Sequence, residues 1–182
     1  MDHPRIKVTF PPPINIASPI TFAYIMTKAT TRPFIDPTKV ALFITSSKPF
    51  SEDWVKSQCE MAERSAESGE DLHLEVIQGD FQGWSPFKLA RDYVYPRLFE
   101  EPTTFAYVSF VVLDDTSHKD RKLVIVGVHP DSFKGASLEI EATSRMEANF
   151  AIDLPLTFHY GNQAITSYPC DLYDNEAERN AA

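Results

Sequence analysis

The sequence predicts a mixed α/β domain, built as one five-stranded sheet with helices on its faces. Three observations carry this prediction. Short apolar runs rich in β-branched residues indicate buried strands, helical patterns join the first three of these runs, and only eight residues join the third run to the fourth. Helical crossovers keep strands parallel, whereas so short a connection reverses the chain. We therefore expect the first three strands to be parallel, the fourth antiparallel, and the fifth parallel to the first.

The first strand and its crossover helix are expected from residue 40 onward. VALFITS (40–46) is a short apolar run, as a buried strand would be. Ser51 follows as a helix N-cap, with Glu52 and Asp53 in the first turn, where the helix dipole favours negative charge. One face of the helix then repeats at spacings of four, three and four, and Gly69 ends it; that face is formed by Val55, Cys59, Ala62 and Ala66.

The second strand is expected at residues 72–77, and Ser85–Pro86 opens the second helix because proline is tolerated at the first helical position. Pro96 should end or kink that helix, since proline removes a backbone donor. Two runs that are apolar on both faces, 105–113 and 122–128, predict paired central strands.

The fifth strand is expected at residues 137–142. Its alternation points Leu138 and Ile140 inward and Glu139 and Glu141 outward, a pattern typical of an edge strand guarded by charge. Residues 156–168 then indicate a hairpin that turns at Gly161–Asn162.

Three parts are predicted along the chain: a proline-rich arm at residues 1–38, the α/β domain at 39–168, and a flexible acidic tail at 169–182. Residues 5–10 of the arm alternate in polarity, and such a segment needs a face to cover. We expect residues 5–10 to pair with a sheet edge of the same subunit or of a neighbour, so that the arm joins a homo-oligomer.

Composition excludes several classes of partner. The chain has 182 residues and a net charge of −9, which argues against nucleic acid and anionic membrane surfaces because both require clustered Lys and Arg. It contains no apolar run of the ~20 residues that a membrane span needs. Its two cysteines, Cys59 and Cys170, are too few for a disulfide framework, so we expect a reducing compartment, the cytoplasm.

Polar side chains gather at the predicted carboxyl end of the parallel strands, where open α/β sheets bind ligands. The candidate acid–base groups there are Asp80, Asp114, His118 and Glu147. The candidate binding groups are Ser46, Trp84, Asp115, Arg145 and Asn149. An alternative explanation is that aspartates after a strand cap turns through their own backbone. Asp80 and Asp114 could also hold Mg²⁺, but neither a metal nor a cofactor is expected.

The familiar catalytic motifs are missing from the sequence. Its six glycines form neither a phosphate-binding loop nor a dinucleotide fingerprint, and its five histidines form no closely spaced ligand pair. GWSP (83–86) lacks the second glycine of a nucleophile elbow. The leading prediction is therefore a non-catalytic binding or assembly protein, with a small polar ligand as one candidate partner. The alternative is a small enzyme that acts on a polar metabolite by acid–base chemistry at the rim, the edge of the sheet where the parallel strands have their carboxyl ends.

Residues 40–160 resemble an uncharacterised family of small bacterial and fungal α/β domains. The resemblance lies in LFITSSKPFSEDWVKSQCEMA, FAYVSFVVLDD, KLVIVGV and SRMEANFAIDLPLTF. It implies the same α/β fold and matches four positions of the family pattern, Trp54, Asp114, Glu147 and Asn149. It implies no activity. The chain departs from the pattern at Gly127, where relatives tend to carry a second aspartate, and at Pro155, which is expected to interrupt a stretch that looks helical in relatives.

Overall fold

The computed structural model describes residues 37–66, 72–96, 105–106, 108–129, 138–161 and 163–181. The predicted strand at residues 5–10, and with it the expected contact of the arm, lies outside the described residues. No helix within the described ranges is long and apolar enough to cross a membrane.

A single mixed sheet forms the centre of the fold, with the strand order β2-β1-β3-β4-β5-β6. β1 pairs in parallel with both β2 and β3, whereas β4, β5 and β6 each run antiparallel to the strand before them. The predicted directions of the first five strands are confirmed, but the prediction of five strands was wrong because a sixth is present. The strands are β1 (Lys39–Ile44), β2 (His73–Val76), β3 (Ser109–Leu113), β4 (Leu123–Val128), β5 (Ile140–Met146) and β6 (Asp171–Leu172).

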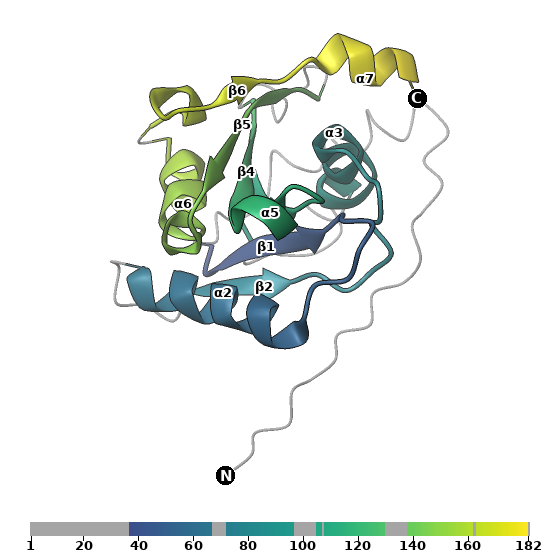
Figure 1. Cartoon of the computed structure of the whole chain (residues 1–182). Coiled ribbons are helices and arrows are strands. Elements are labelled where there is room, and N and C mark those ends of the chain that lie inside the picture. Colours follow the sequence, from purple (N-terminus) through teal and green to yellow (C-terminus); the bar gives the residue numbers. More distant parts are fainter. Residues whose placement is uncertain are drawn as a thin grey trace.

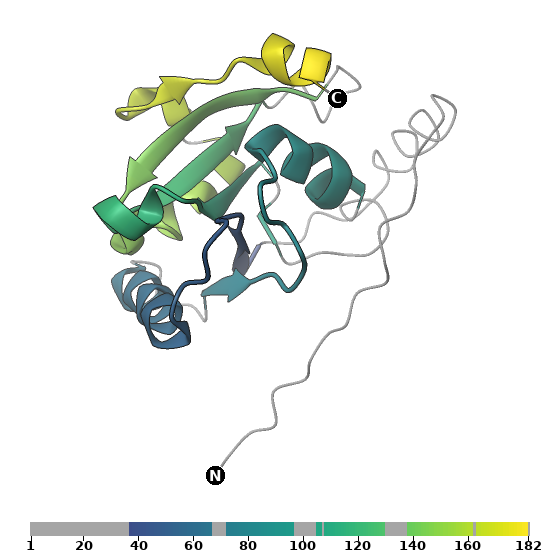
Figure 2. The same cartoon turned by 45° about the vertical axis from the view of Figure 1, so that its right-hand side comes forward.

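The sixth strand and the helix after it lie in the segment predicted to be a tail. β6 runs along the outer edge of β5, and α7 (Asn175–Ala181) follows it (Figure 2). The Asn175 side chain accepts from the backbone N–H of Ile140 at 2.8 Å and donates to its carbonyl at 2.7 Å. An amide side chain thus substitutes for a neighbouring strand at this end of β5, which satisfies backbone groups that an edge would leave open.

The two faces of the sheet carry separate hydrophobic cores. On one face, α2 (Glu52–Ser65) and α6 (Asp153–His159) cover the first core, which includes Val40, Leu42, Val111, Leu113 and Ile125. On the other face, α3 (Pro86–Leu89), continued by a π-helical turn η1 (Ala90–Val94), covers the second core, which includes Phe43, Phe110, Val112 and Val126. Figure 1 shows α2 and α6 on a different side of the strands from α3.

The two crossover helices begin as the sequence predicts. Ser51 caps α2 by accepting from the Trp54 N–H at 3.2 Å, and Ser85 caps α3 by accepting from the Lys88 N–H at 3.2 Å. Each hydroxyl satisfies one of the backbone donors that a helix leaves open at its start. Both helices therefore start at fixed points just beyond the carboxyl ends of β1 and β2.

The predicted hairpin at residues 156–168 was wrong. Helix α6 occupies its first part, and a 3₁₀ turn, η4 (Ile165–Ser167), follows a glycine with a left-handed backbone, Gly161. Pro155 is the third residue of α6, where its missing N–H needs no partner inside the helix, so it does not interrupt it.

The prediction for the fifth strand was also partly wrong. β5 is flanked by β4 and β6 rather than lying at an edge, and it runs to Met146. Its pairing with β4 shifts by one residue, because Gly127 pairs with Ala142 whereas Val128 pairs with Ile140. Glu141 is the extra residue of this β-bulge.

Candidate functional site

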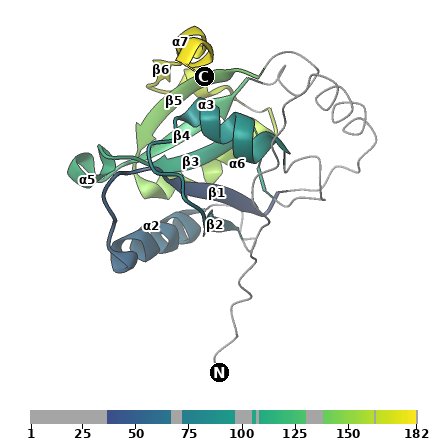
Figure 3. The same ribbon diagram turned by 90° about the vertical axis from the view of Figure 1, so that its right-hand side faces the viewer.

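The predicted rim exists at the carboxyl end of the parallel strands. A short helix, α5 (Ser117–Asp120), lies beyond that end of the sheet (Figure 3). Ser46 follows β1, Asp114 and Asp115 follow β3, and Arg145 lies near the end of β5. The structure thus brings together four of the nine predicted site residues, with His118 of α5 as a fifth.

Asp114 and Arg145 form an ion pair at the rim. The Asp114 Oδ2 accepts from Nη2 of Arg145, and Nη1 of the same guanidinium donates to Asp120 Oδ2 at 3.0 Å. The other Asp114 oxygen accepts from the N–H and the hydroxyl of Ser117, both at 3.0 Å. Asp114 therefore caps the turn into α5 and also holds Arg145 in place.

The ionisation of Asp114 follows from these partners. Burial alone would raise the pKa of the Asp114 carboxyl, but the hydrogen bond and the charge of Arg145, together with two bonds from Ser117, more than offset it. The net effect lowers the pKa below its ordinary value. Asp114 is thus a carboxylate at neutral pH, and a carboxylate held in this way is a poor proton donor.

Asp115 connects two loops across the rim. Its Oδ1 accepts from the Ser46 hydroxyl at 2.7 Å, from the Ser47 N–H at 2.7 Å and from the Ser47 hydroxyl at 2.9 Å. Hydrogen bonds from Ser46 and then from Ser47 lower the pKa of the Asp115 carboxyl. The loop after β1 is therefore fastened to the turn after β3 by a charged acceptor with three donors.

The buried Ser46 hydroxyl also lies beside a histidine. The Nε2 of His118 is 3.0 Å from Ser46 Oγ and 3.2 Å from the carbonyl of Lys48. Because a carbonyl can only accept, this geometry requires a proton on Nε2. Lys48 donates its N–H to Ser46 Oγ at 3.1 Å, so the hydroxyl has two donors facing it and gives its own proton to Asp115.

This arrangement differs from a serine–histidine–aspartate triad. In a triad the histidine takes the serine proton, and the carboxylate orients the histidine from its other nitrogen. Here the carboxylate of Asp115 binds the serine itself, and the Nε2 of His118 faces a carbonyl. Ser46, Asp115 and His118 can therefore hold two loops together but are not arranged to activate a nucleophile.

A column of stacked groups stands beside these bonds. The His118 ring lies on Phe50 with centroids 3.8 Å apart and planes inclined by 6°, and Phe50 stacks on Trp54 at 4.9 Å. The Arg121 guanidinium lies over the Trp54 ring at 4.3 Å. Arg121 adopts a left-handed backbone with φ of 61°, so α5 ends where its side chain can reach Trp54. The start of α2 and both ends of α5 thus pack as one unit.

The remaining predicted site residues do not join this group. Asp80 is exposed and accepts only from the Gln82 N–H, at 3.4 Å, among the described residues. Trp84 packs edge-to-face on Phe81 at 5.5 Å, with the Lys88 ammonium 4.5 Å from its ring centre. Within the described part of the chain, the side chains of Glu147 and Asn149 make no hydrogen bond or ion pair with another residue.

Clusters of metal ligands and cysteine thiols are two further kinds of candidate site. Within the described ranges, no group of three or more His, Cys, Asp or Glu side chains is placed to hold a metal ion. Cys59 is a free, half-buried thiol on α2. Burial, followed by the charge of Glu63, raises the pKa of Cys59 to about 11, which leaves the thiol protonated and unreactive at neutral pH.

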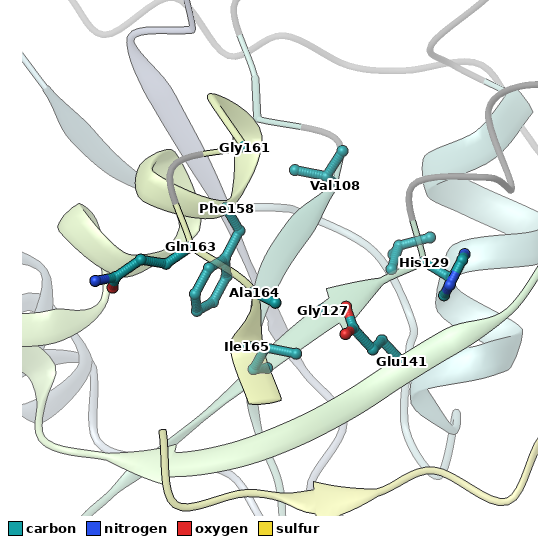
Figure 4. Close-up of a pocket in the computed structure, with 10 residues that line it drawn as sticks. Val108, Gly127, His129, Glu141, Phe158, Gly161, Gln163, Ala164 and Ile165 are labelled. Atoms are coloured by element: carbon teal, nitrogen blue, oxygen red, sulfur yellow. The ribbon is translucent and has the colours of Figure 1, made fainter. Parts of the chain in front are cut away.

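A pocket of about 340 Å³ lies at the opposite end of the sheet from the rim. It is bordered by the start of β3, the end of β4, the bulge of β5 and the chain after α6. Figure 4 shows Glu141 beside Gly127 on the sheet, with Phe158 of α6 and Ile165 of η4 on the other side. The described lining is Val108, Gly127, Val128, His129, Glu141, Phe158, Gly161, Gln163, Ala164 and Ile165.

Gly127 explains how η4 can close this pocket from one side. A Cβ placed on Gly127 would lie 2.8 Å from Cγ2 of Ile165, closer than such atoms approach, and 3.1 Å from its Cβ, which is an unusually tight contact. Only a residue without a side chain lets Ile165 settle against β4 at this point. Any side chain at this position would displace η4 and the pocket wall it forms.

The sequence prediction missed the pocket and its only described carboxylate, Glu141. In the sequence Glu141 is an outward residue of a regular alternation, and its neighbours give no sign of a bulge. Phe158 and Ile165 fell within the predicted hairpin, so their helical and 3₁₀ surroundings could not be anticipated.

No known family model matches the chain, and no curated protein or solved structure matches it either.

Proposed function

We propose that the chain is a non-catalytic binding domain, in which the rim is a structural clamp and the pocket beside β5 holds a small ligand. One observation carries the proposal. The polar groups that the rim would need for catalysis are bonded to each other, as Asp114 is to Arg145 and Ser46 is to Asp115. The pocket, in contrast, lies at the other end of the sheet and is open.

The electrostatics of the rim support a clamp. Arg145 faces two carboxylates, those of Asp114 and Asp120, so the cluster already supplies more negative than positive charge. An anionic substrate would have to displace one of these carboxylates from the guanidinium. Acid–base work would require a group that gains and loses its proton near neutral pH, and the lowered pKa values of Asp114 and Asp115 move both carboxyls away from that range.

A small enzyme acting at the rim is the second candidate, and one observation favours it. Ser46 Oγ lies within hydrogen-bond distance of both an imidazole and a carboxylate. For catalysis, His118 would have to turn its Nε2 away from the Lys48 carbonyl and lose the proton that this contact requires. The clamp and the enzyme therefore differ in one measurable property, the reactivity of Ser46.

The reactivity of Ser46 is tested with a fluorophosphonate probe, which labels activated serines covalently. We expect the wild-type protein to remain unlabelled under conditions that fully label a serine hydrolase used as the positive control. Ser46→Ala should lower the free energy of unfolding by about 1–2 kcal/mol, because a buried hydroxyl with three partners is lost.

Stability is measured by urea denaturation, and Ser57→Ala, at an exposed position of α2, is the matched control. Mass-spectrometric labelling of wild-type Ser46 that is absent from Ser46→Ala would reject the clamp and establish the enzyme. An unchanged unfolding midpoint in Ser46→Ala would show that these bonds fasten nothing.

We also propose that the binding domain assembles through its N-terminal arm. The supporting observation is that β2 pairs with β1 on one side and with no strand on the other, within the part of the chain that the structure describes. Such an edge can accept an added strand. Deletion of residues 1–13 should lower the melting temperature by several degrees or reduce the mass measured by light scattering. An unchanged melting temperature together with an unchanged mass would contradict the proposed role of the arm.

A further inference from the structure

We infer that the pocket beside β5 binds a small organic cation, an amine carried on an apolar or aromatic body, with Glu141 as its counter-ion. The inference rests on the proposed function, because it names the class of ligand that this binding domain takes. Three features of the described pocket support it: the bulge that places Glu141, the lack of a described partner for the Glu141 carboxylate, and the apolar wall opposite.

The bulge places Glu141 on the pocket side of the sheet. Ile140 belongs to the core under α3, whereas Ala142 belongs to the core under α2 and α6. In an unbroken strand, residues two apart point to the same face. The extra residue of the bulge breaks this alternation, so Ile140 and Ala142 point to opposite faces. Glu141 consequently joins Gly127 and Ile165 in lining the pocket (Figure 4). Bulges are frequent beside binding sites because they redirect a side chain in this way.

The carboxylate of Glu141 has no partner among the residues that the structure describes. Its backbone carbonyl accepts from the Tyr173 N–H at 3.4 Å, but its side chain forms no hydrogen bond or ion pair there. Other carboxylates in or next to the sheet are paired, such as Glu75 of β2 with Lys39 at 2.6 Å and Glu139, just before β5, with Arg179 at 3.0 Å. A cationic ligand would supply the counter-charge that no described residue gives this half-buried side chain.

The opposite wall suits the body of such a ligand. The Phe158 ring, Val108 and Ile165 present apolar surface, and the ring packs edge-to-face on Tyr168 with centroids 6.0 Å apart. Tyr168 in turn donates its hydroxyl to Gln163, so the wall is braced from outside the pocket. An aromatic face beside a carboxylate attracts a cation from two sides. A volume of about 340 Å³ accommodates a ligand of roughly ten to fifteen non-hydrogen atoms.

Three probes of similar size and different charge test the inference: 2-phenylethylamine, 2-phenylethanol and 3-phenylpropanoate. Each is titrated into the full-length ¹⁵N-labelled protein while the amide signals of Gly127, Gly161 and Ala164 are followed. We expect the amine to shift these signals with saturation, the alcohol to bind at least tenfold more weakly, and the carboxylate to leave them unmoved. Glu141→Gln should weaken amine binding at least tenfold, since it keeps the shape and removes the charge.

Glu52→Gln is the matched control, because it removes the same charge from an exposed position at the start of α2. It should leave amine binding unchanged. Equal binding of the amine and the alcohol, or amine binding that survives Glu141→Gln, would overturn the cation assignment while leaving the pocket as a binding site. If none of the three probes moves the pocket amides at millimolar concentration, the cation assignment and the proposed binding pocket both fail.

Discussion

Val112→Asp should prevent the protein from accumulating in soluble, folded form. Val112 is 2% exposed, lies on the central strand β3 and is flanked by Phe43 on β1 and Val124 on β4. A carboxylate at this position would have no hydrogen-bond donor to replace the water it loses, which costs several kcal/mol. Domains of this size have a free energy of unfolding of only about 5–15 kcal/mol, so this substitution can remove most of it.

The measurement is the soluble fraction after expression, followed by a thermal melt of any soluble protein. Ser57→Asp introduces the same charge at an exposed position of α2 and should leave both quantities close to the wild-type values. A soluble Val112→Asp protein with a cooperative melt near the wild-type temperature would contradict the burial of β3 between two layers.

Arg145→Met should destabilise the protein by about 2 kcal/mol at neutral pH. The substitution leaves the carboxylates of Asp114 and Asp120 near each other without the cation that joins them. Breaking a fully buried ion pair lowers the free energy of unfolding by more than this, whereas breaking an exposed pair changes it very little. The Arg145 side chain is 29% exposed and the Asp114 side chain is 36% exposed, so this pair lies between those limits.

The pH dependence of this loss follows from the pKa of Asp114. Arg145 and Ser117 hold the pKa of the Asp114 carboxyl below its unfolded value, so their stabilisation is fully present above about pH 4 and is lost as the pH falls through the folded pKa. Without Arg145, burial is left opposed by Ser117 alone, and acidification removes the repulsion between the two aspartates. The difference between wild type and Arg145→Met should therefore narrow at acidic pH.

Urea midpoints at pH 7 and pH 3 measure this effect. Arg64→Met, at an exposed position of α2, is the control and should show a small difference at both values. If Arg145→Met is as stable as the wild type at pH 7, the ion pair contributes nothing. If its deficit is the same at pH 3, the loss comes from packing and not from charge.

The central sheet was predictable because connection length alone decides strand direction in this chain. Eight residues between two runs that are apolar on both faces leave no room for a crossover, and β3 and β4 are antiparallel accordingly. The caps Ser51 and Ser85 were predictable for a different reason, because each hydroxyl binds a backbone N–H only three residues further along the chain. Local signals of this kind carry over from sequence to structure without knowledge of the rest of the chain.

The bulge was not predictable, because the sequence alternates through it without a break. Leu138, Ile140 and Ala142 suggest one inward face, yet Ile140 and Ala142 pack into different cores. β6 was equally hidden, because a strand of two exposed residues has no apolar pattern of its own. Asn175 and Arg179 attach this region to β5 through contacts distant in sequence.

The rim was predictable in position but not in role. Strand directions bring Asp114 and Arg145 to one edge of the sheet, as the sequence indicates. Whether the Arg145 guanidinium then binds a ligand or a neighbouring carboxylate depends on the side-chain conformations, which a sequence pattern does not predict. The loop after β2 reaches β1, where the Gly83 N–H donates to the Thr45 carbonyl at 2.8 Å, but among the described residues the Asp80 side chain accepts only from Gln82 within its own turn.

The stacked column has an optical consequence. The chain contains two tryptophans, and each lies against a different layer of the sheet: Trp54 between Phe50 and Arg121 at the rim, and Trp84 beside Phe81 under the Lys88 ammonium. A nearby charge shifts indole emission, so loosening of either layer changes the fluorescence of its own tryptophan. Each tryptophan thus reports on its own layer of the fold. Replacing one of them with phenylalanine leaves the fluorescence of the other, so that the two layers can be followed separately.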